Sequence, residues 1–202
     1  MIFYEPAKGH TLAHDPFNSI IAPRPIGWIS TRSETGVLNL APYSFFNAFN
    51  YTPPIVGFSS VGRKDSLTNA EATGEFVWNL VTEPLAEAMN QTSAAVAADI
   101  DEFQLAGLTP APSRLLQVPR VLESPVAFEC RVSQIVPLRS AAQELTPSSV
   151  VFGEVVGIHI AEELVVNGIY DTSRARHIVR GGGPGDYFRI GPEQLFQLFR
   201  PT

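Results

Sequence analysis

The amino-acid sequence predicts a mainly β fold, a mostly antiparallel barrel with a few peripheral helices. Three observations indicate this class: short alternating strand patterns, an excess of turn residues, and no regular strand–helix alternation of the kind that a doubly wound parallel sheet requires. Of the 202 residues, 17 are proline and 15 are glycine, a share above the average of about 12% and below the roughly 25–30% of disordered chains. The length favours one domain over residues 1–202 with a sizeable core.

The first part of the chain is expected to contain an arm followed by three strands. Residues 1–22 have mixed polarity and several prolines and glycines, which is typical of an irregular N-terminal arm. Residues 26–31 and 37–40 flank a glycine-bearing turn and predict a β-hairpin. Two successive prolines then force extended backbone, so the next strand is predicted over residues 55–61.

Two helices are predicted in the middle of the chain. Residues 65–74 form the first, because Asp65 can cap the free N–H groups at its start and Gly74 can adopt the left-handed conformation at its end. A strand over residues 76–81 follows. The second helix is predicted over residues 82–97, with a proline near its start, where a missing N–H is tolerated.

Two longer strands are predicted after a loop over residues 99–119 that contains about one helical turn. In residues 126–132 the even-numbered positions are apolar, so that face is expected to join the core. It includes Cys130, which we interpret as a small buried hydrophobe and not as a reactive thiol. Residues 150–160 also have apolar even-numbered positions, interrupted by Glu154. For Glu154 we favour exposure on the outer face over burial with an ionic partner, because burying a charge is costly.

The charge balance and cysteine count restrict the function classes. The chain has 14 Lys and Arg against 20 Asp and Glu, a net charge of −6. This argues against unspecific nucleic-acid or anionic-membrane binding, and an anionic ligand would need a local cationic pocket. One cysteine cannot form an intrachain disulfide, the first residues do not resemble a secretion signal, and no apolar run is long enough to span a bilayer. We therefore expect a cytoplasmic protein with no membrane or nucleic-acid partner.

Several well-known catalytic motifs are missing. The glycine-rich residues 181–185 do not form a dinucleotide fingerprint, because Asp186 stands at the sixth position and Pro184 would disturb the start of a helix. Phosphate-loop, serine-hydrolase and zinc-protease motifs are not found in the sequence. His10 and His14 are four residues apart, but the arm is not convincingly helical, so no metal site is expected.

A candidate phosphate site lies where the strand over residues 55–61 leads into the first helix. Free backbone N–H groups, the positive end of the helix dipole, Arg63, Lys64 and the hydroxyls of Ser66 and Thr68 converge there. The alternative is an ordinary capped helix with two solvated cations, and the segment alone does not decide between them. Two adjacent cations in an acidic chain favour the phosphate site.

A candidate ring-binding segment follows the predicted hairpin. Residues 39–47 combine small residues, several aromatic side chains and two asparagines. They could form a wall on which a planar ring lies, with backbone amides at its edge. Taken alone, the segment is better explained as an aromatic plug in the core beneath a loop.

Together these segments resemble the flavin reductase-like family of FMN-binding split barrels, which includes flavoredoxins and the reductase components of two-component monooxygenases. The resemblance covers about residues 20–190 and rests on six segments in the same order: RPIGWIST (24–31), NLAPYSFFN (39–47), PPIVGF (53–58), RKDSLTN (63–69), FVWNL (76–80) and GEVV (153–156). Each segment alone is weak, whereas the set is specific.

The resemblance implies a six-stranded antiparallel split β-barrel that forms a homodimer, with one FMN per subunit at the interface. The side chains it places around the isoalloxazine and ribityl groups are Ser30, Thr31, Tyr43, Ser44, Phe45 and Asn47. Those it places around the phosphate are Ser59, Ser60, Arg63, Lys64, Asp65 and Thr68. No catalytic side chain and no metal ligand is implied, because the hydride chemistry belongs to the cofactor.

The resemblance also implies a C-terminal element near the flavin. It corresponds to Gly182, Gly183 and Tyr187, although the inserted residues 184–185 shift the correspondence by a residue or two. The preceding basic side chains could attract a nicotinamide dinucleotide, while a solvated basic turn is the favoured alternative. These side chains are Arg174, Arg176, His177 and Arg180.

The activity implied is that of an NAD(P)H:FMN oxidoreductase, a flavin reductase that passes electrons to a partner, such as a flavin-dependent monooxygenase or another acceptor, or releases reduced flavin. Two alternatives stay open. One is a flavoredoxin-type FMN electron carrier with no productive NAD(P)H complex. The other is a β-barrel binding module without redox turnover. Preference for NADH or NADPH does not follow from the sequence.

Overall fold

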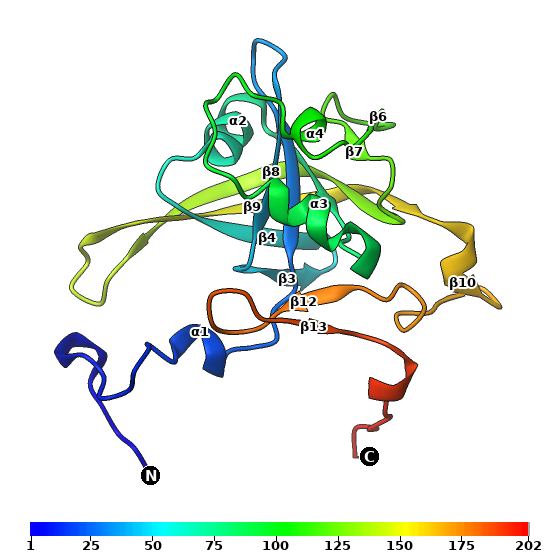
Figure 1. Ribbon diagram of the computed structural model, residues 1–202. Coiled ribbons are helices and arrows are strands. Elements are labelled where there is room, and N and C mark those ends of the chain that lie inside the picture. Colours follow the sequence, from blue (N-terminus) through cyan, green and yellow to red (C-terminus); the bar gives the residue numbers. More distant parts are fainter. Residues whose placement is uncertain (202) are drawn as a thin grey trace.

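A seven-stranded antiparallel sheet forms the centre of the computed structural model, which describes residues 1–201. The helices from the middle of the chain lie on one side of the sheet, and the two terminal segments, with a short helix near the N-terminus, lie on the other (Figure 1). The strand order is β2-β1-β5-β8-β9-β4-β3. The strands are β1 (Gly27–Arg32), β2 (Leu38–Tyr43), β3 (Phe46–Tyr51), β4 (Pro54–Val61), β5 (Glu75–Asn79), β8 (Val126–Arg139) and β9 (Leu145–Ile160).

The mainly β antiparallel class is confirmed, but the predicted six-stranded barrel differs from the structure in two respects. The sheet has seven strands and ends in two unpaired edges, β2 and β3. The additional strand is β3, which pairs with β4. Aromatic side chains have a high preference for strands, and here they extend the sheet by one edge strand.

The predicted hairpin and the first helix are confirmed. Strands β1 and β2 pair in antiparallel register from Gly27 opposite Tyr43 to Arg32 opposite Leu38. Helix α2 covers Asp65–Thr73, and Gly74 closes it with a φ of 72°. Its start differs from the prediction, because Lys64 occupies the capping position and Asp65 is the first helical residue.

The second predicted helix is interrupted and short. A 3₁₀ turn, η2 (Glu83–Leu85), leads into α3 (Ala86–Gln91), which ends well before residue 97. The Thr92 hydroxyl donates to the Met89 carbonyl and accepts a hydrogen bond from Trp28 Nε1, so this side chain competes with the helix backbone. The loop over 99–119 contains the expected helical turn, α4 (Glu102–Leu105).

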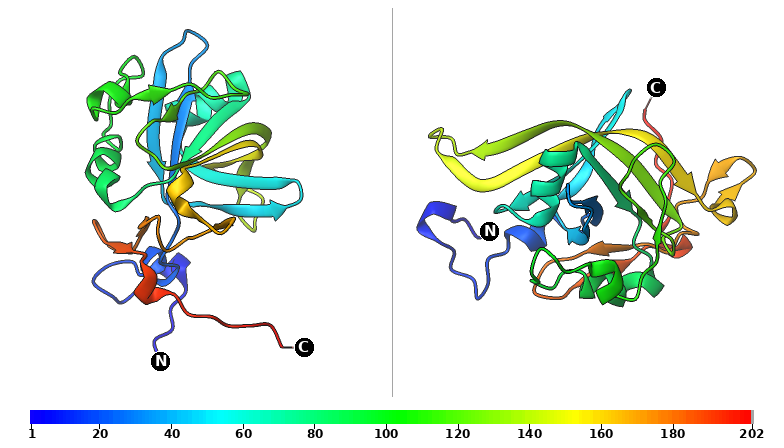
Figure 2. Two further views of the ribbon diagram at one scale, coloured as in Figure 1. Left: turned by 90° about the vertical axis from the view of Figure 1, so that its right-hand side faces the viewer. Right: turned by 90° about the horizontal axis from the view of Figure 1, so that it is seen from above.

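The β8–β9 hairpin is much longer than predicted and projects from the body of the molecule (Figure 2). The first part of β8, residues 126–130, is largely buried on both faces, because residues 113–121 cover the face that carries Ala127 and Glu129. In β9 the buried residues are Val151, Gly153 and Val155, which lie on the face opposite the even-numbered apolar positions. Glu154 is exposed, as favoured from the sequence.

The core consists of two main clusters. One fills the inside of the curved sheet and includes Phe58, Phe76 and Cys130, so the interpretation of Cys130 as a buried hydrophobe is confirmed. The other lies beneath α3 and α4 and includes Trp28 and Phe103. Among residues 1–201, no helix is both long and apolar enough to cross a membrane.

The terminal segments lie below the sheet. Residues 1–22 contain only η1 (Pro6–Lys8) and α1 (Phe17–Ile20), and none of them is buried, as expected for an arm. Near the C-terminus, β12 (Ile178–Arg180) pairs with β13 (Tyr187–Arg189). The remaining short elements are β6 (Pro110–Ala111), β7 (Arg120–Val121), η3 (Glu162–Leu164), β10 (Val165–Val166), β11 (Ile169–Tyr170) and η4 (Pro192–Gln194).

Candidate functional site

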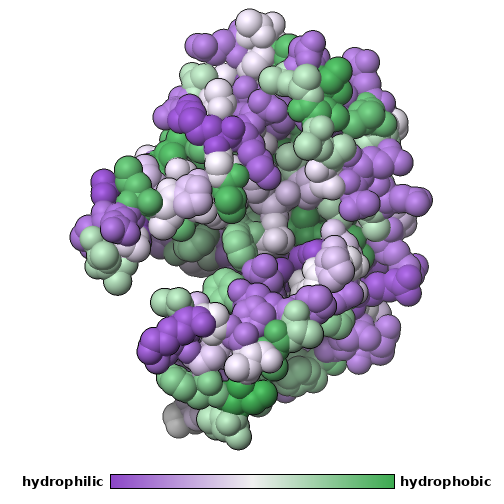
Figure 3. Space-filling view, turned by 60° about the vertical axis from the view of Figure 1, so that its left-hand side comes forward, coloured by the Kyte–Doolittle hydropathy of each residue, from purple (hydrophilic) through white to green (hydrophobic). Residues whose placement is uncertain are grey.

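A first cavity, which we call the Phe45 cavity, lies between the end of β2, strand β4 and the segment that precedes β1. Its volume is about 360 Å³, and its lining includes Arg24, Ser44, Phe45, Asn47 and Ser59. The Phe45 ring is 38% exposed, and the guanidinium carbon of Arg24 lies 5.7 Å from the ring centroid. One wall of the cavity therefore offers planar apolar surface next to a cation. Figure 3 shows that this side of the molecule is hollowed between the sheet and the terminal segments.

Arg24 connects the chain segments around this cavity. Its guanidinium donates to the carbonyl oxygens of Ser44 at 3.2 Å and Gly181 at 3.0 Å, and also to that of Asn18. Burial, and then the charge of Arg180, lowers the pKa of Arg24, but a guanidinium stays protonated in proteins. The arm, the end of β2 and the glycine-rich segment are thus held by one buried cation.

A second cavity, which we call the α2 cavity, lies at the N-terminus of α2. Its volume is about 350 Å³, and its lining includes Tyr43, Arg63, Lys64, Asp65 and Glu102. Both cavities have volumes in the range of small-molecule sites, roughly 300–1,000 Å³. They are contiguous along the chain, because residues 42–43 line the α2 cavity and residues 44–47 line the Phe45 cavity.

The start of α2 leaves backbone donors and one cation without protein partners. The first N–H groups of a helix have no partner within the helix, and no side chain caps α2. Arg63 is engaged by Glu71, with Nη2 and Oε2 at 2.5 Å. Lys64 is exposed and forms no ion pair within residues 1–201. Lys64 and the helix N-terminus therefore supply the free positive charge of this cavity, and Thr68 is exposed one turn further along the helix.

A buried phenol, that of Tyr43, and a buried carboxyl group, that of Glu102, also border the α2 cavity. Tyr43 is 6% exposed, and its hydroxyl has no hydrogen-bond partner within residues 1–201. Burial raises the pKa of Tyr43, so the phenol is neutral at physiological pH. Glu102 is 5% exposed, and it accepts a hydrogen bond from the Leu40 backbone N–H at 3.0 Å. Burial also raises the pKa of Glu102.

Three predicted cofactor contacts lie inside the protein. The Ser30 hydroxyl donates to the Pro119 carbonyl at 2.7 Å, and the Thr31 hydroxyl accepts from Asn39 and Asn69. Ser30, Thr31 and Ser60 are all fully buried and line neither the Phe45 cavity nor the α2 cavity. Their side chains hold the strands and helices that form the site.

Two roles were considered for the aromatic residues around the end of β2: a wall for a planar ring and a plug in the core. The structure shows residues in each role. Tyr43 and Phe46 are buried in the core, where the Phe46 ring stacks on Trp78 with centroids 5.5 Å apart. Phe45 and Phe49 are exposed and line the Phe45 cavity. The segment is therefore both a core plug and a wall: Tyr43 and Phe46 stand at the ends of β2 and β3, whereas Phe45 lies in the turn between them.

The C-terminal glycines lie close to the Phe45 cavity, whereas Tyr187 does not line it. Gly181 accepts a hydrogen bond from Arg24, and a Cβ atom on Gly182 would overlap with Ser19 of the arm. Tyr187 lines a separate cavity beside η2 and α3, and its ring centroid lies 4.8 Å from the Arg180 guanidinium carbon.

The basic residues of 174–180 are largely engaged within the chain. Arg174 pairs with Asp171, Arg176 pairs with Glu83 at 2.9 Å, and Arg180 donates to the Gly183 carbonyl. His177 lines an apolar cavity with Trp78 and Phe128, and its Nδ1 has no hydrogen-bond partner within residues 1–201. Burial lowers the pKa of His177, which favours the neutral imidazole.

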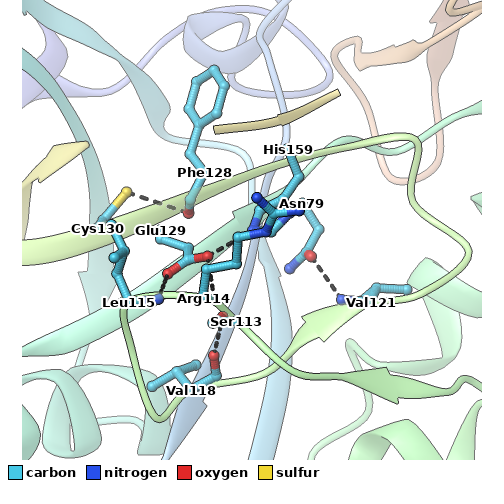
Figure 4. A network of polar contacts seen from close by, with 10 residues as sticks. All are labelled: Asn79, Ser113, Arg114, Leu115, Val118, Val121, Phe128, Glu129, Cys130 and His159. Atoms are coloured by element: carbon cyan, nitrogen blue, oxygen red, sulfur yellow. Dashed lines mark hydrogen bonds and ion pairs between the residues drawn. The ribbon is translucent and has the colours of Figure 1, made fainter. Parts of the chain in front are cut away.

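Sequence reasoning missed a buried carboxylate outside these cavities. Glu129 is fully buried and accepts hydrogen bonds from the backbone N–H groups of Arg114 and Leu115 and from the His159 ring (Figure 4). No local signal could have located it, because its donors lie 14, 15 and 30 residues away in the chain.

Comparisons with known proteins agree with this architecture. Residues 20–178 match the family described as flavin reductase like domain. A protein of Halalkalibacterium halodurans, described as uncharacterized, is 36% identical over 188 residues, which are 90% of this chain and 88% of that protein. The structure of nitrilotriacetate monooxygenase component B from Bacillus cereus is 32% identical, with a TM-score of 0.87 and coverage of 98% of both chains.

The chain belongs to the flavin reductase-like family. A structure from Shewanella frigidimarina described with a split barrel domain has a TM-score of 0.77, at 24% identity over 92% of this chain and 89% of that one, and bears on the fold alone. The fold is therefore of the split-barrel type, with an open seven-stranded sheet. Family membership supports an oxidoreductase with an FMN-related function.

Proposed function

We propose that this protein binds FMN in the Phe45 and α2 cavities and acts as an NAD(P)H-dependent flavin reductase. The observation that carries the proposal is the start of α2, where uncapped N–H groups and the unpaired Lys64 border the α2 cavity. The Phe45 cavity, which follows it along the chain, has an exposed aromatic ring as one wall. Backbone donors and a cation at a helix N-terminus favour a phosphate group. The wall formed by Phe45 favours a planar ring system.

The residues around the α2 cavity fit a phosphate in hydrogen bonding, and Lys64 supplies an unpaired cation. The Arg63 charge is offset by Glu71, and the lining also includes the carboxyl groups of Asp65 and Glu102, so the phosphate depends mainly on Lys64 and the helix N-terminus. The Tyr43 hydroxyl, which is buried without a partner, is a further donor beside the cavity. Thr68 and Asp65 complete the predicted phosphate segment.

The residues around the Phe45 cavity fit the ring and ribityl parts of FMN. Ser44, Asn47 and Ser59 provide polar side chains along the wall formed by Phe45. Arg24 fixes the end of β2 through the Ser44 carbonyl, so it orients this wall. We assign Ser30, Thr31 and Ser60 a supporting role, because their hydroxyls are buried. Gly182 and Gly183 border the site through the segment that Arg24 holds.

FMN, when bound, supplies the redox chemistry by accepting a hydride from NAD(P)H and passing its electrons on. The protein's part is to bind the phosphate, to hold the ring against Phe45 and to limit the access of water. We further propose that two copies form a homodimer and that the electrons go to a partner such as a flavin-dependent monooxygenase. Sedimentation of the FMN-bound protein as a single 22.0 kDa particle would refute the dimer.

The first test is the replacement of Lys64. A charged hydrogen bond contributes about 1.5–3 kcal/mol, and roughly 1.4 kcal/mol corresponds to tenfold in affinity. Lys64→Ala should therefore weaken FMN binding about tenfold or more at low salt, measured by quenching of flavin fluorescence. The matched control is Lys8→Ala, since Lys8 pairs with Glu5 in the exposed arm. Equal FMN affinity of the two variants would contradict the phosphate assignment.

Stopped-flow mixing with NADH or NADPH separates the proposed function from its alternatives. Rapid loss of the flavin absorbance identifies a flavin reductase, and the faster nucleotide is the preferred reductant. A protein that retains FMN but is not reduced by either nucleotide would be a flavoredoxin-type carrier. A protein that neither retains nor binds FMN would be a binding module without redox turnover.

A further inference from the structure

A third cavity lies between residues 113–125 and the inner part of the β8–β9 hairpin, and no residue lines both this cavity and either cofactor cavity. Its volume is about 710 Å³. Its polar lining includes Arg114, Arg120, Glu129 and His159. We call it the His159 cavity. It is about twice as large as each proposed cofactor cavity and has no role in the function proposed above.

The floor of this cavity contains the fully buried carboxylate of Glu129. Its Oε1 accepts from the Arg114 N–H at 2.7 Å and contacts His159 Nε2 at 2.6 Å, while Oε2 accepts from the Leu115 N–H at 2.8 Å (Figure 4). Burial by itself raises the pKa of Glu129, but these donors outweigh it and lower the pKa overall, so the carboxylate is ionised. An ionised carboxylate only accepts, so Nε2 carries the proton.

This arrangement fixes the orientation of the His159 ring at the cavity surface. The side chain of His159 is 22% exposed, whereas that of Glu129 is not exposed. Its second nitrogen, Nδ1, makes no hydrogen bond within residues 1–201. The carboxylate thus holds one nitrogen and leaves the other available to a ligand.

Two arginines beside His159 also have no protein partner. Neither the Arg114 nor the Arg120 guanidinium forms a hydrogen bond or an ion pair within residues 1–201, and the buried Arg120 Nε is among the donors left without a partner. The nearby Glu123 already accepts from the Thr109 backbone N–H with both oxygens. Besides Glu123 and Glu129, one further carboxylate lines the cavity within residues 1–201, that of Glu163.

The rest of the lining is apolar and partly open to solvent. Leu115, Leu122, Ile158 and Ile160 are 54%, 52%, 54% and 43% exposed. Exposed apolar side chains that gather in one place beside polar residues often mark a ligand-binding groove or an interaction site. The cavity thus combines unpaired cations with an apolar wall, which is the chemistry that recognises an anion with an apolar body.

We propose that the His159 cavity is a second binding site, separate from the FMN site, for a small organic anion. The carboxylate or phosphate group of the ligand is held by the guanidinium groups of Arg114 and Arg120, beside the ring of His159. Its apolar body lies against Leu122 and the leucine and isoleucine side chains around it. Planar bidentate recognition of carboxylate and phosphate is the typical role of arginine.

The test uses the full-length protein saturated with FMN and three probes of similar size or charge: benzoate, benzamide and acetate. Calorimetry measures affinity, and NMR of the imidazole signals of His159 reports the place of binding. Benzoate should bind to one site per chain and shift the His159 signals. Benzamide lacks the charge and acetate lacks the apolar body, so each should bind at least about tenfold more weakly.

Arg114→Gln and Arg120→Gln should each weaken benzoate binding about tenfold, a loss of about 1.4 kcal/mol. The matched control is Arg131→Gln, because Arg131 is an exposed, unpaired arginine on β8, the strand that carries Glu129, and lies outside the cavity. Comparing the affinities of phenyl phosphate and benzoate shows whether the cavity prefers a phosphate or a carboxylate group. Tight binding of either compound in the His159 cavity supports the proposal.

Three results would overturn the proposal. The first is the absence of any benzoate binding or His159 shift. The second is equal affinity for benzoate and benzamide. The third is competition between benzoate and FMN, which would place the anion in the cofactor cavities. None of these depends on the reductase activity, so failure of the proposed function would leave the result interpretable.

Discussion

Replacing the buried carboxylate of Glu129 should destabilise the fold more than any other single removal of charge. In Glu129→Gln the amide oxygen can still accept from the Arg114 N–H and from His159, but the amide group then faces the Leu115 N–H. One buried donor is left unsatisfied, at a cost of about 1–3 kcal/mol. The two remaining hydrogen bonds lose their ionic character and become weaker. We expect a total loss of about 2–4 kcal/mol.

The assay is urea unfolding followed by tryptophan fluorescence, with a thermal scan as a second measurement. For a chain of this length, 1 kcal/mol shifts the melting temperature by about 2–4 °C, so the expected decrease is about 4–16 °C. Glu154→Gln is the matched control, because Glu154 is an exposed glutamate on the neighbouring strand. Its change should stay within about 0.5 kcal/mol.

The pH dependence gives an independent check on Glu129. Its pKa in the folded protein is lowered, so its contribution is fully present above the unfolded pKa and is lost as the pH falls through the folded pKa. The difference in unfolding free energy between wild type and Glu129→Gln should therefore be constant near neutral pH and should shrink below about pH 4. A variant as stable as wild type at pH 7 would refute the hydrogen-bonded carboxylate described above.

Three further substitutions or measurements test the packing and the other buried groups. Glu102→Gln keeps an acceptor for the Leu40 N–H and removes a carboxyl group whose pKa is raised by burial. The stability of wild type relative to this variant should therefore fall as the pH rises from about 4 through the folded pKa; a difference that stays constant with pH would contradict this. Gly153→Ala should cost about 1–3 kcal/mol, because its Cβ would overlap with the fully buried Phe76 ring; an unchanged urea midpoint would contradict this. Cys130 should not react with a thiol reagent in the native protein, since burial raises the pKa of its thiol, but should react once the chain is unfolded in urea.

The parts of the fold that the sequence predicted well are those with local signals. The hairpin at β1 and β2 has a glycine-bearing turn between two apolar runs, and α2 has a glycine that closes it. Both signals act within a few residues, so they do not depend on the rest of the chain. Part of the candidate site was also predictable from a local signal, because Arg63, Lys64 and Asp65 stand at the start of α2 and line one cavity.

The sequence was less informative about the two long strands. In β9, apolar residues stand at both even and odd positions, so alternation could not tell that Val151 and Val155 face the core. In β8, Glu129 looked like a residue of the polar face. It is buried because residues 113–121 cross over it, and that contact depends on chain segments far apart in the sequence. Ser30 is buried for the same reason, since its hydroxyl donates to Pro119 of this segment.

The net charge of −6 does not prevent anion binding, because what matters is which cations are left without a partner. Arg63, Arg174 and Arg176 are each engaged by a carboxylate, so they add little field beyond their own ion pair. Lys64 at the start of α2 and the two arginines of the His159 cavity have no such partner within residues 1–201. These three side chains thus bring free positive charge to the α2 cavity and the His159 cavity. High salt should weaken phosphate binding at the exposed Lys64 more than benzoate binding beside the partly buried Arg120.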